Sequence, residues 1–143
     1  SVPASRFHPQ YNKRALEASL QAYGIRYVYL GQVLWGRPAD ASCYPAGAGD
    51  RYAQPDYAEV MVRGWFTAGM AQLLALAWEG RTAILCSEED PARCHRQHLI
   101  AAFLRSQHPE VSVLHIRKDG SLQSAAAPGP DGRGEVPGRL PLL

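Results

Sequence analysis

Residues 82–105, TAILCSEEDPARCHRQHLIAAFLR, decide the expected fold. The stretch opens with a short apolar run, 82–86, of the kind found in strands that are buried on both faces of a parallel sheet. Asp90 and Pro91 then give the usual signals of a helix start, and the helix is expected to run to about Arg105. The stretch therefore predicts a buried strand, a polar loop and a crossover helix.

The segments on either side repeat this alternation. Helices are expected where apolar residues recur every three or four positions, and strands where β-branched and aromatic residues run together. These segments are a helix over 13–23, a strand over 25–30, a helix over 56–78 and a strand over 112–116. The alternating order predicts right-handed crossovers, and hence an α/β fold: a small three-layer domain with a mainly parallel sheet.

The chain of 143 residues has the length of one domain. Residues 1–120 carry the alternating pattern and are expected to form a single α/β domain. Residues 121–143 are rich in Ala, Gly and Pro without periodicity, so we expect a disordered or loosely attached tail. Residues 31–54 are dense in Gly, Pro, Asp and Ser and indicate a long loop, a kind of segment that often carries function.

Composition narrows the class of protein. A net charge of +2 is too mild to indicate a nucleic-acid binder by itself. No run of about 18 apolar residues is present, so no membrane span is expected. No secretory signal is visible. The three cysteines, Cys43, Cys86 and Cys94, are too few and too irregular for a disulfide framework, which favours a reducing, cytoplasmic location.

The segment from Cys86 to Arg96 concentrates reactive side chains. It holds two thiols, three carboxylates, an imidazole and two guanidinium groups, between an expected strand end and a helix start. Sites in parallel sheets lie beyond the carboxyl ends of the strands, and helix N-termini favour anions and thiolates. If the helix begins at Pro91, a helical wheel turns Arg96 toward Cys86 and turns Cys94 away.

Four interpretations of this segment remain open. In the first, Cys86 is a nucleophile or redox thiol, Glu88 carries or orients a proton, and Arg96 holds an anion. In the second, zinc is held by Cys86 and Cys94 with a histidine, although paired Cys-x-x-Cys spacing is lacking. In the third, arginines bind phosphate and the thiols only pack. In the fourth, the cysteines are core residues and the charges are solvated. The residues expected to bind the anionic substrate are Arg6, Arg37, Arg93 and His95. The histidine of the zinc alternative is His95 or His98.

Several ordered motifs point to a family. They include Pro9-Gln10-Tyr11-Asn12, Leu34-Trp35-Gly36-Arg37-Pro38, Cys86-Ser87-Glu88 and Cys94-His95-Arg96. With these motifs, residues 1–120 resemble the bacterial and archaeal domain of unknown function 488. The resemblance implies a compact α/β domain and no particular activity. Family members commonly have an earlier strand before the first motif, which this chain is expected to lack, and a Gly-Gly pair where Trp35-Gly36 stands.

These observations favour a thiol-dependent enzyme that acts on a small anionic, phosphate- or nucleotide-like substrate at the Cys86–Arg96 segment. The alternative is a non-enzymatic module that binds nucleic acid or phosphate, with structural or zinc-bound Cys and His. That module would use a basic cluster interleaved with aromatic residues near the start of the chain. No cofactor is required by the sequence, and zinc is an open alternative that ranks below the thiol interpretation. The oligomeric state is not determined by the sequence.

Overall fold

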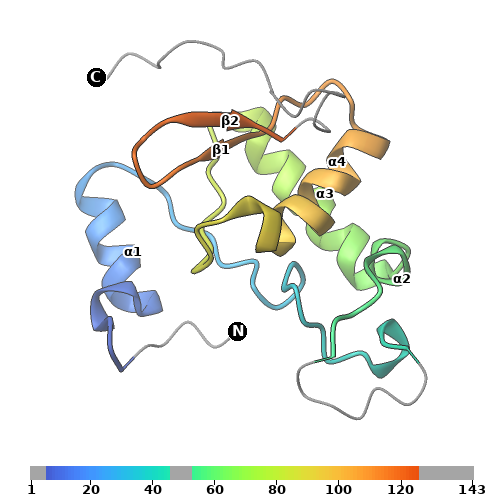
Figure 1. Ribbon diagram of the computed structural model, residues 1–143. Helices are drawn as coiled ribbons and strands as arrows, with labels where there is room; N and C mark the ends of the chain where they lie inside the picture. The colour runs from blue at the N-terminus through green and yellow to red at the C-terminus, as the bar shows by residue number, and fades with distance from the viewer. Residues whose placement is uncertain (1–5, 46–52, 126–143) are drawn as a thin grey trace.

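The computed structural model describes residues 6–45 and 53–125, most of whose regular structure is helical (Figure 1). Longer helices alternate with single turns, and the strands come last in the chain. The elements are η1 (Pro9–Tyr11), α1 (Lys13–Ala22), η2 (Ala41–Cys43), α2 (Tyr57–Met61), α3 (Gly64–Glu79), η3 (Pro91–Arg93), η4 (Arg96–Ala101), α4 (Ala102–Gln107), β1 (Leu114–Ile116) and β2 (Leu122–Ser124).

The prediction of a three-layer α/β domain with a mainly parallel sheet is wrong. The described residues contain one sheet, an antiparallel hairpin in which Leu114 pairs with Ser124 and Ile116 with Leu122. Segments 25–30 and 82–86 have no strand pairing. Their apolar side chains are not covered as a buried parallel strand requires, since Leu85 is 68% exposed. Residue types in these runs suit a pleated surface, but they do not supply a pairing partner.

The first predicted helix is confirmed as α1, and its end follows from Gly24. This glycine has a φ of 70°, a left-handed conformation that other residues adopt at a cost. The amide of Gly24 donates to the Gln21 carbonyl and the amide of Ile25 donates to the Leu20 carbonyl, both at 3.0 Å. This pair of bonds is a Schellman motif, which satisfies the last carbonyls of the helix. None of the residues of α1 is buried, and the helix lies to one side of the others (Figure 1).

The predicted helix over 56–78 is divided into α2 and α3. Asp56 caps α2 as its residue type suggests, because its Oδ1 accepts the amide of Ala58 at 2.9 Å. The chain turns extended at Arg63, with a ψ of 135°, and Gly64 begins the longer α3. The break allows α2 and α3 to present Val60 and Phe66 to the same core, where both side chains are fully buried.

The hydrophobic core lies between α3, η4 and α4. Phe66 of α3 meets Phe103 of α4 edge to face, with ring centroids 5.4 Å apart. Gly69 of α3 lets the loop of residues 31–45 approach, since a Cβ there would stand 2.7 Å from Cγ2 of Val33. The core cluster of buried residues is Leu34, Cys43, Val60, Phe66, Met70, Leu73, Leu99, Ile100 and Leu104. Packing against this core fixes both the loop and η4.

The stretch that was expected to be one helix from Pro91 is interrupted at Cys94. Asp90 caps the first turn by accepting the amide of Ala92 at 3.0 Å, as predicted. This turn, η3, ends before Cys94, whose backbone is extended with a ψ of 137°. The chain then re-enters a helix with the π turn η4, which continues into α4. Such π turns are frequent at functional sites.

Gly120, which has a φ of 81°, lies in the turn between β1 and β2. The strand β2 follows within the segment that was expected to be a tail, while residues 126–143 lie outside the described residues. Among residues 6–45 and 53–125, no helix combines the length and apolar character needed to cross a membrane.

Candidate functional site

Two sulfur atoms and one imidazole nitrogen converge at the start of η4. The Sγ atoms of Cys86 and Cys94 are 3.6 Å apart. Nδ1 of His95 lies 3.9 Å from each of them. In the part of the chain that the structure describes, no other group of three His, Cys, Asp or Glu side chains is gathered closely enough to hold a metal ion. We call Cys86, Cys94 and His95 the cysteine–histidine cluster.

The interruption of the helix creates the cluster. In a continuous helix, residues 94 and 95 would point about 100° apart. The extended backbone of Cys94 instead lets both its side chain and that of His95 meet Cys86. The helical wheel predicted that Cys94 points away from Cys86, and this prediction is wrong. The wheel assumed one continuous helix from Pro91, whereas the helix is interrupted at Cys94. Cys94 is buried and Cys86 is half-buried, so Cys86 is the more exposed cysteine of the cluster.

Arg96 lies across the cluster and joins its two segments. Its Nε donates to Sγ of Cys94 at 3.2 Å, and its backbone amide approaches the same sulfur at 3.4 Å. The far end of the guanidinium donates to the carbonyl oxygen of Glu88. Arg96 thus places a positive charge beside the sulfur of Cys94, whereas the sequence pattern paired this arginine with Cys86.

The loop of residues 31–45 covers the imidazole. Gly36 is buried against His95, and a Cβ at residue 36 would stand 2.6 Å from Cγ and 2.9 Å from Nδ1 of that ring. The hydroxyl of Tyr57 donates to the Gly36 carbonyl at 3.3 Å. The hydroxyl of Tyr44 donates to the Pro38 carbonyl at 2.9 Å. Sequence reasoning noted the Gly36 motif but missed its contact with His95 and the role of Tyr57.

Burial sets the protonation of the cluster. It raises the pKa of the Cys94 thiol, although the hydrogen bonds from Arg96 act in the opposite direction. Burial, and then the charge of Arg96, lower the pKa of His95. Without a metal ion, the cluster therefore holds a protonated Cys94 and a neutral imidazole at neutral pH. A neutral imidazole is the form that ligates metals.

Two other predicted site residues near the cluster are Glu88 and His98, and the side chain of neither joins it. Glu88 meets Arg96 through its backbone carbonyl, and the residue is exposed. His98 points away from the cluster, since its Nε2 lies 2.8 Å from the carbonyl of Ala92. His98 is therefore not part of the metal-ligand set that includes Cys86, Cys94 and His95.

The predicted anion-binding arginines are spread over several segments. Arg37 is half-buried and close enough to Tyr57 to influence its pKa, which burial raises and Arg37 lowers. Arg93 is exposed at the end of η3, and Arg6 is exposed ahead of η1. Arg96 and Arg37 thus border the region of the cluster and of Tyr57.

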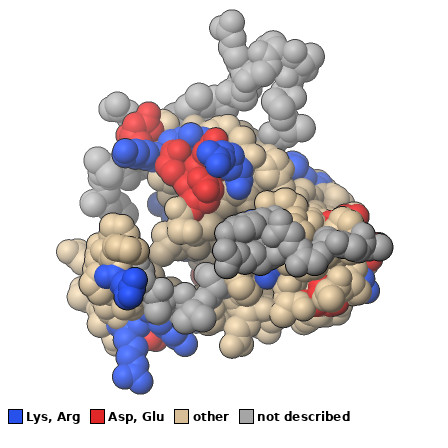
Figure 2. Space-filling model, turned by 60° about the horizontal axis from the view of Figure 1, so that its bottom comes forward, with Lys and Arg blue, Asp and Glu red and all other residues tan. Residues whose placement is uncertain are grey.

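The structure also shows contacts of the basic segment near the start of the chain. Nζ of Lys13 lies 5.3 Å from the ring centroid of Tyr29, a cation–π contact. The rings of His8 and Tyr11 are 6.3 Å apart. On the face shown in Figure 2, basic side chains are scattered among acidic and neutral ones. The arrangement on that face gives no continuous basic surface.

The comparisons with known proteins give a family. Residues 1–103 match the family model described as domain of unknown function DUF488. The chain belongs to the DUF488 family. The match includes every residue of the cysteine–histidine cluster and the loop that covers it, and it confirms the resemblance expected from the motifs. The family description assigns no activity to DUF488 proteins, and no curated protein and no solved structure matches this one.

Proposed function

We propose that the cysteine–histidine cluster is a zinc centre with three protein ligands, in an enzyme that acts on a small anionic substrate. The carrying observation is the spacing of the ligand atoms. Zinc bonds of about 2.3 Å to sulfur and about 2.0 Å to nitrogen, in tetrahedral geometry, separate two sulfurs by about 3.8 Å and sulfur from nitrogen by about 3.5 Å. The observed separations are 3.6 Å between sulfurs and 3.9 Å from each sulfur to the nitrogen.

Among residues 6–45 and 53–125, three ligands gather in the cluster, and this number favours a catalytic role over a structural one. Structural zinc sites are closed by four protein ligands, whereas catalytic sites keep a position for water or substrate. His98, the nearest further histidine in sequence, is held by the Ala92 carbonyl instead. Zinc in an open site supplies a bound water of lowered pKa and a Lewis acid. Cys86, which is half-buried, stands on the accessible side of such a centre.

The charges around the cluster favour an anionic substrate. Arg96 is half-buried beside the sulfurs, and Arg37 lies on the side of Tyr57. A guanidinium group suits phosphate and carboxylate oxygens, which it can bind through two parallel hydrogen bonds. A phosphate ester or a related anion would place its charge on these arginines, beside the residues that would hold the zinc.

A free thiol nucleophile is the competing role for the same atoms. Its support is the accessible sulfur of Cys86 beside an imidazole. The convergence of three ligand atoms speaks for metal binding, because a nucleophile needs one sulfur and a base rather than two sulfurs. The neutral state of the imidazole also suits metal binding.

Metal content tests the proposal directly. The purified protein is expected to hold one zinc per chain after dialysis, and Co²⁺ substitution is expected to give the absorption of a thiolate-bound tetrahedral ion. Cys86→Ser, Cys94→Ser and His95→Gln should each lose most of the metal. His98→Gln is the matched control and should retain it. Absence of stoichiometric metal, together with loss of a measured activity in Cys86→Ser, would favour the thiol nucleophile.

Anion binding is tested separately on the Co²⁺-substituted protein. Inorganic phosphate is expected to change the cobalt spectrum in a saturable way, and Arg96→Gln should weaken this binding. Arg26→Gln is a matched control, because Arg26 pairs with Glu79 on an exposed surface. A spectrum that does not respond to phosphate at any concentration would remove the anionic substrate from the proposal and leave the zinc centre standing.

A further inference from the structure

The two segments that form the cysteine–histidine cluster, one ending at Cys86 and one containing Cys94 and His95, differ in how firmly the core holds them. Cys94 and His95 lead directly into η4, which is anchored by the fully buried side chains of Leu99 and Ile100. Cys86 precedes a loop, residues 87–90, whose members are exposed apart from the half-buried Asp90. Hydrophobic packing therefore fixes one side of the cluster, and the side of Cys86 needs another restraint.

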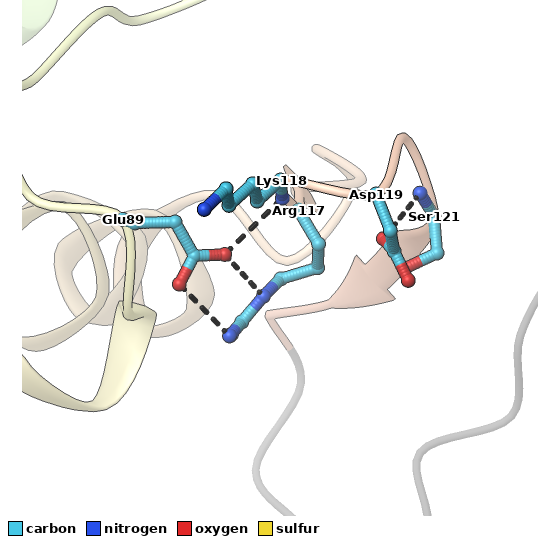
Figure 3. Close-up of a pocket in the computed structure, with 5 residues that line it drawn as sticks. All are labelled: Glu89, Arg117, Lys118, Asp119 and Ser121. Carbon is cyan, nitrogen blue, oxygen red and sulfur yellow. Dashed lines mark hydrogen bonds and ion pairs between the residues drawn. The ribbon is translucent and has the colours of Figure 1, made fainter.

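The carboxylate of Glu89 supplies that restraint through the β1–β2 hairpin. Nε of Arg117 lies 3.1 Å from Oε1 of Glu89, and its NH2 group donates to Oε2 at 3.2 Å. The backbone amide of Lys118 donates to Oε1 as well, at 3.2 Å. Figure 3 shows the carboxylate of Glu89 facing the guanidinium in this two-pronged arrangement. We call the Glu89–Arg117 pair the loop clamp.

The hairpin itself aims Arg117 at the loop. The NH1 group of Arg117 donates to Oε1 of Gln123 across the hairpin at 3.0 Å. The amide of Arg117 donates to the Ser121 carbonyl at 2.9 Å, which closes the turn. Bidentate geometry and a second partner restrict the guanidinium, so the pair transmits the position of the hairpin to Glu89. The shallow depression at this place is lined by Glu89, Arg117, Lys118, Asp119 and Ser121, and the Glu89–Arg117 salt bridge lies within it (Figure 3).

We propose that the loop clamp positions Cys86 for metal binding, so that the β1–β2 hairpin is a supporting element of the site. This inference rests on the proposed zinc centre. Glu89 lies three residues from Cys86, and Arg96 ties the intervening Glu88 carbonyl to η4. The loop is therefore restrained from two sides, by η4 and by the hairpin. Arg117 and Glu89 are positioning residues, because neither touches the metal ligands.

Because the loop clamp is partly exposed, its effect on the position of Cys86 can be distinguished from an effect on the stability of the whole protein. The side chains of Arg117 and Glu89 are 28% and 46% exposed. Ion pairs that remain in contact with solvent contribute little to the free energy of unfolding. A loss of the pair should therefore leave the protein folded while Cys86 becomes less well placed. Partners that orient metal ligands commonly change metal affinity by about 10- to 100-fold when they are removed.

The test compares Glu89→Gln and Arg117→Gln with Glu79→Gln, which breaks the exposed Arg26–Glu79 pair. Zinc affinity is measured by competition with a chelator of known affinity. We expect an affinity about tenfold lower in each clamp variant, no further loss in the double variant, and no change in Glu79→Gln. The thiolate-to-cobalt absorption should fall in the clamp variants, since the weakened ligand is a sulfur. Equal zinc affinity in Glu89→Gln and Glu79→Gln would overturn the inference.

A second measurement keeps the inference separate from the proposed function. In metal-free protein, oxidised glutathione converts the thiols of Cys86 and Cys94 to a disulfide and is itself reduced to two thiols. The sulfurs are 3.6 Å apart, so this closure reports how well Cys86 is held near Cys94. The rate should fall in Glu89→Gln and not in Glu79→Gln. If the wild-type protein binds no zinc but Glu89→Gln forms the disulfide more slowly than wild type, the loop clamp is supported and the zinc centre is rejected. Equal rates of disulfide formation in wild type and Glu89→Gln would overturn the loop clamp.

Discussion

The Cα atom of Gly36 lies so close to the imidazole of His95 that a Cβ on residue 36 would stand 2.6 Å from the ring carbon Cγ. Gly36 has no left-handed backbone, since the positive φ angles in the described residues belong to Gly24 and Gly120. The requirement for glycine is therefore steric. The covering loop can rest on the imidazole because residue 36 has no side chain.

Gly36→Ala should displace either the loop or the imidazole and weaken zinc binding. Ring displacement moves Nδ1, the ligand atom that faces both sulfurs. The expected loss is about tenfold or more in zinc affinity, on the scale seen when metal ligands lose their orientation. Gly64→Ala is the control, because a Cβ there meets nothing within 4 Å. Unchanged affinity in Gly36→Ala would show that the loop gives way without moving His95.

Tyr57→Phe should loosen the same loop at a smaller cost. The change removes the hydroxyl that donates to the Gly36 carbonyl and leaves the ring in place. A hydrogen bond of this kind contributes about 1 kcal/mol to the free energy of unfolding. Tyr44→Phe removes a comparable bond to Pro38 in the same loop. Chemical denaturation should show similar destabilisation in both variants, while zinc affinity should fall more in Tyr57→Phe.

Glu88→Gln should leave zinc affinity within about twofold of wild type. The structure ties residue 88 to Arg96 through its backbone carbonyl, which the substitution preserves. The comparison with Glu89→Gln is informative, because the two glutamates are neighbours and only Glu89 binds the hairpin through its carboxylate. A strong loss of zinc in Glu88→Gln would place the carboxylate of Glu88 among the ligands.

The metal-free protein should lose stability as pH falls below about 6.5, the ordinary pKa of histidine. Burial, and then the charges of Arg96 and Arg117, lower the pKa of His115, whose Nε2 donates to Oε1 of Gln97 at 2.7 Å. Around and below the unfolded pKa the unfolded state binds more protons, so the free energy of unfolding decreases as the pH falls. Urea unfolding at pH 7.5 and pH 5.5 measures this change.

His115→Gln should reduce the difference in unfolding free energy between the two pH values. The remaining difference is expected to include His95, whose pKa is shifted in the same direction. His98→Gln serves as the comparison, because His98 is exposed. An equal pH dependence in wild type and His115→Gln would rule out His115 as its source.

Alkylation against pH should distinguish the two thiols of the metal-free cluster. Burial raises the pKa of Cys94, so its reaction should have a midpoint above the ordinary value of about 8.5. Cys86 is the accessible sulfur and should react first at every pH. Peptide mass spectrometry follows each site, and zinc should suppress both reactions. Fast modification of Cys94 at neutral pH would contradict its protonated, buried state.

Local signals in the sequence predicted local structure well. Asp56 and Asp90 were expected at helix starts, and each caps its helix by accepting an amide two residues later. Gly24 was expected at the end of α1 and adopts the left-handed conformation there. Each of these signals depends on a few neighbouring residues, and side-chain chemistry determines the outcome over that distance.

The sheet and the arrangement of the site depend on distant parts of the chain. Segments 25–30 and 82–86 have strand-forming residues, but pairing requires a partner that no residue pattern within them specifies. Cys86 and Cys94 come into contact because the helix is interrupted at Cys94. A helical wheel that starts at Pro91 assumes helical backbone at every position, so it could not predict the extended backbone of Cys94. The zinc alternative already contained Cys86, Cys94 and His95, because ligand chemistry is visible in residue types.

The π turn of η4 rotates the residues of the site relative to the core-facing residues of α4. A π turn holds one residue more than an α turn, so the backbone before it is rotated by about 100° relative to a continuous α-helix. Deleting one residue from 96–101 would keep Leu104 in the core and swing His95 away from Cys86. Length within this turn, and not only the identity of its residues, therefore sets whether the three ligand atoms meet.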